Sequence, residues 1–362
     1  MDAKSRIQAA FQFAPTDRIP RYEIFLDGYK ENFRKHNNRP PEYDPYDYYD
    51  RIDIGAVLAD QRGPLYRSEA VLSDDGDTQI TRDSWGRRLL QRRSAYFEQA
   101  LEVVLSDKDK LAALTFDDPE ADDKYDAFSG MALTCSRRFA PVSGVLGLFM
   151  GSYRMRGEFD YLMDLAEDRP FCQELAGRLA DFTTKAGLAL ARKTKTLDTA
   201  IWIYDEFSST KGPLFSPAIF EAVFYPLYKK MIGSWKAAGL RHVVLHCDGN
   251  CRPLLDMLLD AGFDGLQGIA PSTGMWLPDI KKEYGRKLVL IGGMDNIDTL
   301  VHGSREEIVY QTAALVEAAQ DGGVILGTHS VDGDISVERY NTYSSYLDEH
   351  DRMNDRSGES GM

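Results

Sequence analysis

RHVVLHCDGNCRPLLDMLLDAGFDGLQGI, residues 241–269, combines two strand patterns with a helix pattern between them. The apolar, β-branched run RHVVLH predicts a buried strand that ends at His246. RPLLDMLLDAG then predicts a helix that ends at a glycine, and FDGLQGI predicts a second short strand. A strand, a helix and a strand in this order are typical of parallel strands joined by a crossover helix.

The same alternation continues on both sides of this unit, giving five strand-then-helix units in a row. At a length of 362 residues, this favours a (β/α)8 TIM barrel. An open doubly wound sheet is the alternative, but no GxGxxG or phosphate-binding loop stands between a strand and a helix. The other strands are expected in TAIWIYDE (199–206), KLVLIGGMDN (287–296) and GVILGTHS (323–330), and the other helices in 158–195 (restarting at Pro170), 216–239, 277–285, 304–319 and from about 336 onwards.

The first part of the chain has a different pattern. A short helix is expected over residues 2–13, and DRIPRYEIFLDG (17–28) is a candidate strand. LSDDGDTQITRDSWGRR (72–88) predicts a hairpin because DDGD carries turn residues. We therefore expect a single domain. Residues 1–130 would form an N-terminal extension and lid-like segment, or a plain peripheral extension, residues 131–350 the barrel core, and residues 351–362 a flexible tail.

Composition excludes several classes of protein. A formal net charge of −14 disfavours nonspecific binding to nucleic acid and to an anionic membrane surface. No run of about 18 apolar residues predicts a membrane-spanning helix. The N-terminus lacks the apolar core of a signal peptide, and four cysteines do not make a disulfide framework. We expect a cytoplasmic protein that does not associate with membranes.

Polar, titratable residues close four of the five strands. They are Asp205-Glu206, His246-Cys247-Asp248, Asp295-Asn296 and His329. Because the carboxyl ends of barrel strands meet at one mouth, these side chains are expected to converge there. Each also has a structural explanation: Asp205 and Glu206 as loop carboxylates, Asp248 as a turn former, Asp295-Asn296 as a helix cap, Cys247 as packing and His329 as a hydrogen-bonding residue.

Two histidines lie on the strand RHVVLH, and only one can reach the mouth. His242 and His246 share a face of the strand, but four strand residues span about 13 Å. His246 stands at the carboxyl end and is the candidate site residue, whereas His242 is expected near the barrel floor. No second cysteine pair completes a structural zinc knuckle with Cys247 and Cys251. Histidines combined with a carboxylate or thiolate would instead form an open, catalytic metal site.

The order of these motifs resembles the uroporphyrinogen decarboxylase superfamily, which includes corrinoid-dependent methyltransferases. The resemblance rests on the Ser216-Pro217 helix start, a strand ending in His-x-x-Gly, GGMDN and LGTHS. RIQAAFQFAPTDRIPRYEIF (6–25) is similar to the opening of that superfamily, so the likeness covers most of the chain and is weakest between 40 and 130. It implies a TIM barrel.

The resemblance also bears on the reaction. The decarboxylases carry an RQAGRY segment whose arginines bind carboxylates, and this chain has IPRYEIFLDG there, so most of the clamp is absent. His329 falls where they have the histidine of LGHG. Thiol-activating methyltransferases show His-x-Cys-Gly with a further cysteine on the last strand; here Asp248 replaces the first cysteine and His329 stands near the other. The chain looks more like the branch that takes methyl groups from methyl ethers.

For that branch, the resemblance implies a zinc pattern of Glu, fourteen residues, Glu, twenty residues and His, which Glu206, Glu221 and His242 fit. Strand geometry disagrees, because it places His242 at the floor and Glu221 inside a helix. Only Glu206 satisfies both. We therefore expect zinc ligands among His246, His329 and Glu206, and catalytic roles for Glu206, Asp248 and Asp295.

The expected activity is that of an O-demethylase methyltransferase. It would move a methyl group from a small methoxylated donor, aromatic or not, to the Co(I) of a corrinoid (cobalamin). A separate binding protein would carry the corrinoid, and zinc or a proton donor would activate the departing oxygen. A homodimer stays open. One alternative is a decarboxylase-like lyase that uses His329 and Asp295 as acid and base without metal. Another is an inactive subunit that binds the corrinoid protein.

Overall fold

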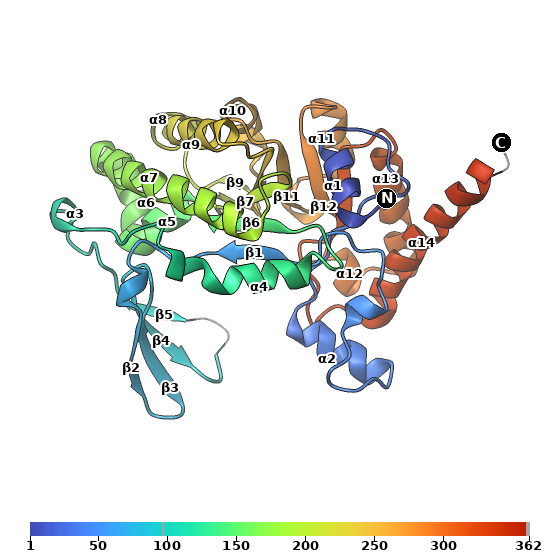
Figure 1. Ribbon diagram of the computed structural model, residues 1–362, viewed down its shortest axis with the longest axis horizontal. Coiled ribbons are helices and arrows are strands. Elements are labelled where there is room, and N and C mark those ends of the chain that lie inside the picture. Colours follow the sequence, from blue (N-terminus) through green and yellow to red (C-terminus); the bar gives the residue numbers. More distant parts are fainter. Residues whose placement is uncertain (96–97, 360–362) are drawn as a thin grey trace.

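Parallel strands lie at the centre of the protein (Figure 1). The structure, a computed structural model, describes residues 1–95 and 98–359, with side chains up to residue 353. Within these residues, seven parallel strands lie in the order β1-β6-β7-β10-β11-β12-β13. Their bounds are β1 Val57–Asp60, β6 Val142–Leu146, β7 Ala200–Tyr204, β10 His242–His246, β11 Gly265–Ile269, β12 Val289–Gly293 and β13 Val324–Gly327.

The segment Arg21–Phe25 closes the barrel between the first and the last of these strands. Arg21 makes a parallel bridge to Leu326 at β13, and Tyr22 makes one to Ile54, just before β1. Phe25 continues the pairing at Val331. This segment lies within the stretch predicted as a strand and takes the place of an eighth strand through isolated bridges, and the barrel is confirmed over the open doubly wound sheet.

Helices surround the barrel and alternate with its strands (Figure 1). The repeating units predicted between 199 and 347 are all present, and Ser216 accepts a hydrogen bond from the backbone N–H of Ile219 as the expected cap. The helix expected over 216–239 is divided at Phe224, because Pro226 restarts it. The bounds are α1 Ala3–Phe11, α2 Asp27–His36, α3 Lys110–Ala113, α4 Asp126–Cys135, α5 Leu148–Arg156, α6 Glu158–Glu167, α7 Arg169–Thr194, α8 Pro217–Val223, α9 Tyr225–Ala237, α10 Leu255–Ala261, α11 Leu277–Tyr284, α12 Thr299–His302, α13 Arg305–Ala319 and α14 Val337–Glu359.

Two apolar cores follow from the alternation of side chains along each strand. One fills the barrel interior, with Trp202 and Val244 among its buried residues, and the other lies between strands and helices. Helix α1 closes the amino-terminal end, where the ring of Phe11 stacks on His242 with centroids 4.3 Å apart. His242 thus lies at the barrel floor, as strand geometry predicts.

The barrel wall begins earlier in the chain than expected. Both Arg21–Phe25 and β1 belong to it, so residues 1–130 are not simply an extension placed before a core at 131–350. Short strands with charged neighbours hide this contribution in the sequence. Helix α14 runs to Glu359, so most of the expected tail 351–362 is helical, and residues 360–362 lie outside the described part.

An antiparallel sheet stands out from the barrel in the first third of the chain (Figure 1). Its strands are β2 Ala70–Asp74, β3 Thr78–Arg82, β4 Arg88–Arg92 and β5 Gln99–Glu102, in that order. The hairpin predicted over 72–88 is therefore confirmed, and its role as a lid stays a prediction. The small hairpin β8 Ser208–Ser209 and β9 Gly212–Pro213 follows β7. Among the described residues, no helix is both long and apolar enough to cross a membrane.

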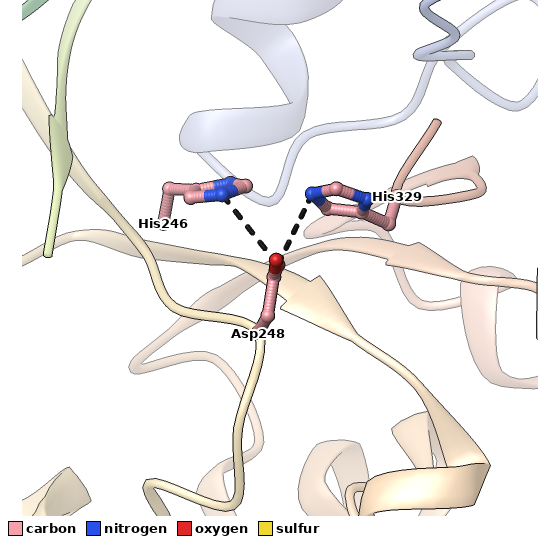
Figure 2. Close-up of side chains that lie close together, drawn as sticks. All are labelled: His246, Asp248 and His329. Carbon is pink, nitrogen blue, oxygen red and sulfur yellow. Dashed lines mark ion pairs between the residues drawn. The ribbon is translucent and has the colours of Figure 1, made fainter. Parts of the chain in front are cut away.

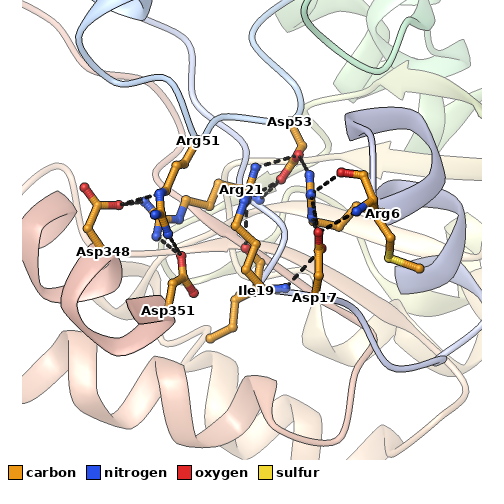
Figure 3. A network of polar contacts seen from close by, with 10 residues as sticks. Arg6, Asp17, Ile19, Arg21, Arg51, Asp53, Asp348 and Asp351 are labelled. Carbon is orange, nitrogen blue, oxygen red and sulfur yellow. Dashed lines mark hydrogen bonds and ion pairs between the residues drawn. The ribbon is translucent and has the colours of Figure 1, made fainter. Parts of the chain in front are cut away.

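Ion pairs fasten the closing strand to its neighbours (Figure 3). The fully buried carboxylate of Asp53 pairs with Arg6 of α1 and, at 2.9 Å, with Arg18, and it accepts the backbone N–H of Arg21 at 2.9 Å. The side chain of Arg21 points to α14, where it pairs with Asp351 and, at 2.5 Å, with Asp348. This network fixes the strand beside β13, whose end carries His329.

Candidate active site

Two histidines and an aspartate meet at the carboxyl end of the barrel. Asp248 Oδ1 lies 3.1 Å from His329 Nε2 and 3.5 Å from His246 Nε2. Figure 2 shows the two imidazoles on either side of the Asp248 carboxylate, which points between them. One ligand atom from each of the three residues lies within 4.8 Å of the others. His246 is buried, His329 is partly exposed and half of the Asp248 side chain is exposed, so the cluster opens to solvent at one edge.

Strand register explains this placement. His246 is the last residue of β10, and it pairs directly with Tyr204 of β7 and Gln267 of β11. Neighbours in a parallel register face the same side, so these three form a row across the barrel interior. Asp248 follows two residues after the end of β10, and His329 two residues after the end of β13. Both therefore come from the loops in which a barrel places its chemistry.

A glycine in the neighbouring strand makes room for the aspartate. Gly268 has φ +94°, and a Cβ added there would lie 2.6 Å from the Cys247 carbonyl oxygen and 3.0 Å from Asp248 Oδ1. Any larger residue would collide with the loop and also adopt a strained backbone. Gly249, next to Asp248, likewise approaches the backbone of Ser208, where an added Cβ would lie 2.2 Å from the carbonyl oxygen.

Glu206 borders the cluster from the end of β7. Its Oε1 lies 3.1 Å from His246 Nε2, and its Oε2 accepts the backbone N–H of Asp248 at 2.7 Å. Glu206 thus contacts one histidine and the loop, whereas Asp248 contacts both histidines. The sequence predicted Glu206 as a metal ligand and gave Asp248 a catalytic role only. In the structure, Asp248 lies between the two histidines and Glu206 lies beside His246.

Further contacts fix the two imidazoles. His246 Nδ1 contacts Gln267 Oε1, and the ring of Tyr204 lies 4.7 Å from the His246 ring between centroids. Ser330 Oγ lies 3.1 Å from His329 Nδ1, and the Tyr22 hydroxyl donates to the backbone carbonyl of His329 at 3.2 Å. These contacts hold each histidine in one orientation, as a metal or proton-transfer site requires.

Burial and neighbouring charges shift the pKa values of all three residues of the cluster. Burial lowers the pKa of His246, but the carboxylates of Glu206 and Asp248 outweigh burial and raise it overall. Burial raises the pKa of Asp248, and Glu206 adds to this while the histidines oppose it. Burial also lowers the pKa of His329. A metal ion that binds here needs the unprotonated nitrogen of His246, so its binding competes with protonation of this residue.

The donor atoms suit a divalent transition metal such as zinc. Ligand atoms about 2.0–2.2 Å from a tetrahedral zinc are about 3.3–3.6 Å apart. The distances of 3.1 and 3.5 Å from Asp248 to the histidines are close to that spacing. Two imidazoles and a carboxylate are also a common donor set of catalytic zinc, leaving a fourth position for water or substrate. The residues present therefore fit the metal.

Other expected site residues lie outside the cluster. The buried Asp295 carboxylate accepts the backbone N–H groups of Ile297 at 2.8 Å and Asp298 at 2.9 Å. No hydrogen bond or ion pair joins Asp295 to His329 among the described residues, so the expected catalytic role has no contact to support it. The expected helix cap is not formed either, because the N-cap of α12 is Asp298, and Asp295 instead stabilises the turn before that helix. Glu221 is exposed on α8, as expected from helix geometry, and does not meet His242.

Asp205 turns away from the mouth although it precedes Glu206. Its fully buried carboxylate accepts the backbone N–H groups of Phe149 at 3.1 Å and Met150 at 2.7 Å, and the hydroxyl of Tyr228. Burial raises the pKa of Asp205 to about 7, although these hydrogen bonds oppose the shift. Asp205 therefore anchors the start of α5 to the end of β7, and this fixes the backbone that carries Glu206.

Gln267 and Tyr204 also lie at the site, although the sequence did not predict either of them there. Gln267 is fully buried, and the other residues of β11 are glycine, leucine and isoleucine. A lone amide in an apolar strand was the available signal. Tyr204 ends the apolar run AIWIY of β7 directly before the predicted Asp205-Glu206 pair.

Comparison with known proteins agrees with this architecture. The family model described as uroporphyrinogen decarboxylase (URO-D) matches residues 152–348. Among solved structures, a methyltransferase from Methanosarcina mazei superimposes with a TM-score of 0.69 at 16% sequence identity, covering 97% of this chain and 99% of that one. At this identity the likeness concerns the fold. No curated protein matches the chain.

Proposed function

The chain belongs to the uroporphyrinogen decarboxylase family, and on that premise we propose that it is a methyltransferase acting on a small methoxylated donor. The acceptor in this proposal is the Co(I) corrinoid of a separate binding protein that docks over the barrel mouth. The observation that carries the proposal is the cluster of His246, Asp248 and His329 at that mouth. The full-length likeness to a methyltransferase barrel also supports it.

The arginine positions argue against decarboxylation of a polycarboxylate. Arg21 is the arginine of IPRYEIFLDG, and its guanidinium pairs with Asp348 and Asp351 of α14. Arg18 pairs with the buried Asp53. Neither guanidinium is available to bind a substrate carboxylate. The acid and base pair of the alternative lyase, His329 and Asp295, also has no contact to support it.

The chemistry required is activation of a poor leaving group. A methyl ether releases its oxygen with negative charge, which is unfavourable unless that charge is neutralised. His246, Asp248 and His329 would hold the zinc ion, which supplies a Lewis acid for this oxygen when bound. Glu206 orients His246 and the Asp248 loop through its contacts of 3.1 and 2.7 Å. The Tyr204 ring offers an aromatic donor a packing surface beside His246.

The test begins with metal content. We expect about one zinc per chain in the purified protein, and loss of that zinc in His246→Ala, Asp248→Asn and His329→Ala. His242→Ala is the matched control, because it removes a histidine from the same strand face but at the barrel floor. It should keep the metal. Circular dichroism checks that each variant is folded.

Turnover is then measured with methoxylated aromatic compounds and cobalamin reduced to Co(I), following the loss of the Co(I) absorbance. We expect methylation with the wild type and the His242→Ala control, and none with the three cluster variants. Equal turnover of His246→Ala and the wild type would remove His246 from the reaction. Release of carbon dioxide from a carboxylated substrate, with no cobalt methylation, would establish the lyase instead.

A further inference from the structure

Gln267 is a buried amide in contact with a residue of the candidate metal site. Its side chain is fully buried in β11, and its Oε1 contacts His246 Nδ1. The two residues are direct partners in the β10–β11 register, so the contact is set by the backbone ladder. On the other side of β11, Gln267 pairs with the apolar Ile291 of β12.

This contact determines which nitrogen of His246 carries a proton. An amide oxygen only accepts hydrogen bonds, so Nδ1 must be N–H to satisfy it. In the neutral imidazole, the lone pair then stands on Nε2. Nε2 is the atom that lies 3.5 Å from Asp248 Oδ1, inside the cluster. Without Gln267, the opposite tautomer would be favoured, because Glu206 Oε1 lies 3.1 Å from Nε2 and would accept a proton carried there.

We propose that Gln267 is a positioning residue that holds His246 in the Nδ1–H tautomer and so presents the Nε2 lone pair to a metal ion. The inference rests on the proposed function for the metal, but the tautomer is a property of the metal-free chain. Histidine ligands generally donate their other N–H to a carboxylate or carbonyl oxygen. Here a side-chain amide supplies that oxygen.

Packing alone does not account for an amide at this position. Gln267 Nε2 is buried and has no hydrogen-bond partner among the described residues. Burying an unpaired amide N–H is unfavourable, whereas methionine would fill a similar volume without that cost. The Oε1 contact with His246 is the interaction that methionine could not replace.

The first test is the tautomer itself. The metal-free protein is labelled with ¹⁵N-histidine, and the six histidines give imidazole signals that His246→Gln assigns by difference. At a pH where His246 is neutral, we expect its Nδ1 to be the protonated nitrogen in the wild type. In Gln267→Met, we expect the proton to move to Nε2, facing Glu206. A proton on Nε2 in the wild type would overturn the proposal.

The second test is zinc affinity, measured by competition with a chelator. Removing a hydrogen-bond partner of a metal-bound histidine weakens binding by about 10- to 100-fold, which we expect for Gln267→Met. Gln267→Glu keeps an acceptor oxygen at Nδ1 and should restore the tautomer and most of the affinity. Gln311→Met is the matched control, because Gln311 is also buried but contacts the backbone of Asp295.

The outcomes separate the two proposals. Zinc binding by Gln267→Met as tight as that of the wild type would overturn the role of Gln267. A wild type that binds no zinc, yet shows His246 with its proton on Nδ1, would refute the metal in the proposed function and leave the positioning role supported. An equal loss of affinity in Gln311→Met would show that the effect is general destabilisation, and would overturn the proposal.

Discussion

Replacing Glu23 with glutamine should make the protein more stable at neutral pH. Glu23 lies in the closing strand and is 1% exposed. Its carboxyl accepts hydrogen bonds from the hydroxyls of Thr328 and Tyr340, the latter at 3.1 Å. Burial raises the pKa of Glu23 from 4.5 to about 8, although both hydrogen bonds oppose the shift.

The size of the effect follows from this pKa. Between pH 4.5 and 8, the folded protein holds a proton on Glu23 that the unfolded chain has released, so the unfolding free energy falls as pH rises. The loss is about 1.4 kcal/mol per pH unit, which gives about 3 kcal/mol at pH 7 and about 5 kcal/mol above pH 8. Glutamine has no proton to lose in this pH range, so the unfolding free energy of Glu23→Gln should not fall in this way.

The assay is equilibrium unfolding in urea at several pH values from 5 to 9. The stability of Glu23→Gln relative to the wild type should increase with pH by roughly these amounts. Glu221→Gln, on the exposed surface of α8, is the control and should show no such trend. A difference between Glu23→Gln and the wild type that does not change with pH would refute the reasoning.

Three further predictions concern the ion network and the cluster. Asp53→Asn should lower the unfolding free energy by about 3–5 kcal/mol in urea denaturation, because Arg6 and Arg18 lose a fully buried partner; a change below 1 kcal/mol would contradict this. Gly268→Ala should weaken zinc binding in a chelator titration, since its Cβ would meet the Asp248 carboxylate, whereas Gly177→Ala, in open space on α7, should not. Zinc at about 100 times its dissociation constant should stabilise the wild type by about 2.7 kcal/mol in calorimetry. The stability of His246→Ala should not change, and equal stabilisation of both proteins would mean that the metal binds elsewhere.

The sequence predicted most of the barrel because its later units alternate regularly. Residues 199–347 hold apolar strands that alternate with helices, and each appears in the structure. The first two strands were harder to place in the wall. β1 has four residues, and the Arg21–Phe25 segment pairs through isolated bridges, so both stretches are too short to show a long apolar pattern. Closure depends on contacts between the two ends of the chain, which local pattern does not encode.

The sequence predicts the site residues that a strand positions, but it does not predict how the loops after the strands place their side chains. His246 ends β10 and faces inward by alternation, and its selection over His242 is consistent with the structure. Asp248 and Glu206 lie two residues beyond strands, where a backbone turn decides which carboxylate reaches both histidines. Gln267 was missed because its partner lies on a neighbouring strand, and strand register is not visible in one sequence.

Closure of the barrel by its first strand has a consequence for synthesis. Glu23 and Thr328, which lie side by side in the finished barrel, are 305 residues apart in the chain. At 5–20 residues per second, a ribosome makes the partner strand about 15–60 s after the first strand. Throughout that interval the first strand has an open edge and Arg21 lacks the α14 carboxylates. We therefore expect the nascent chain, unlike the finished protein, to depend on chaperones that cover unpaired strands.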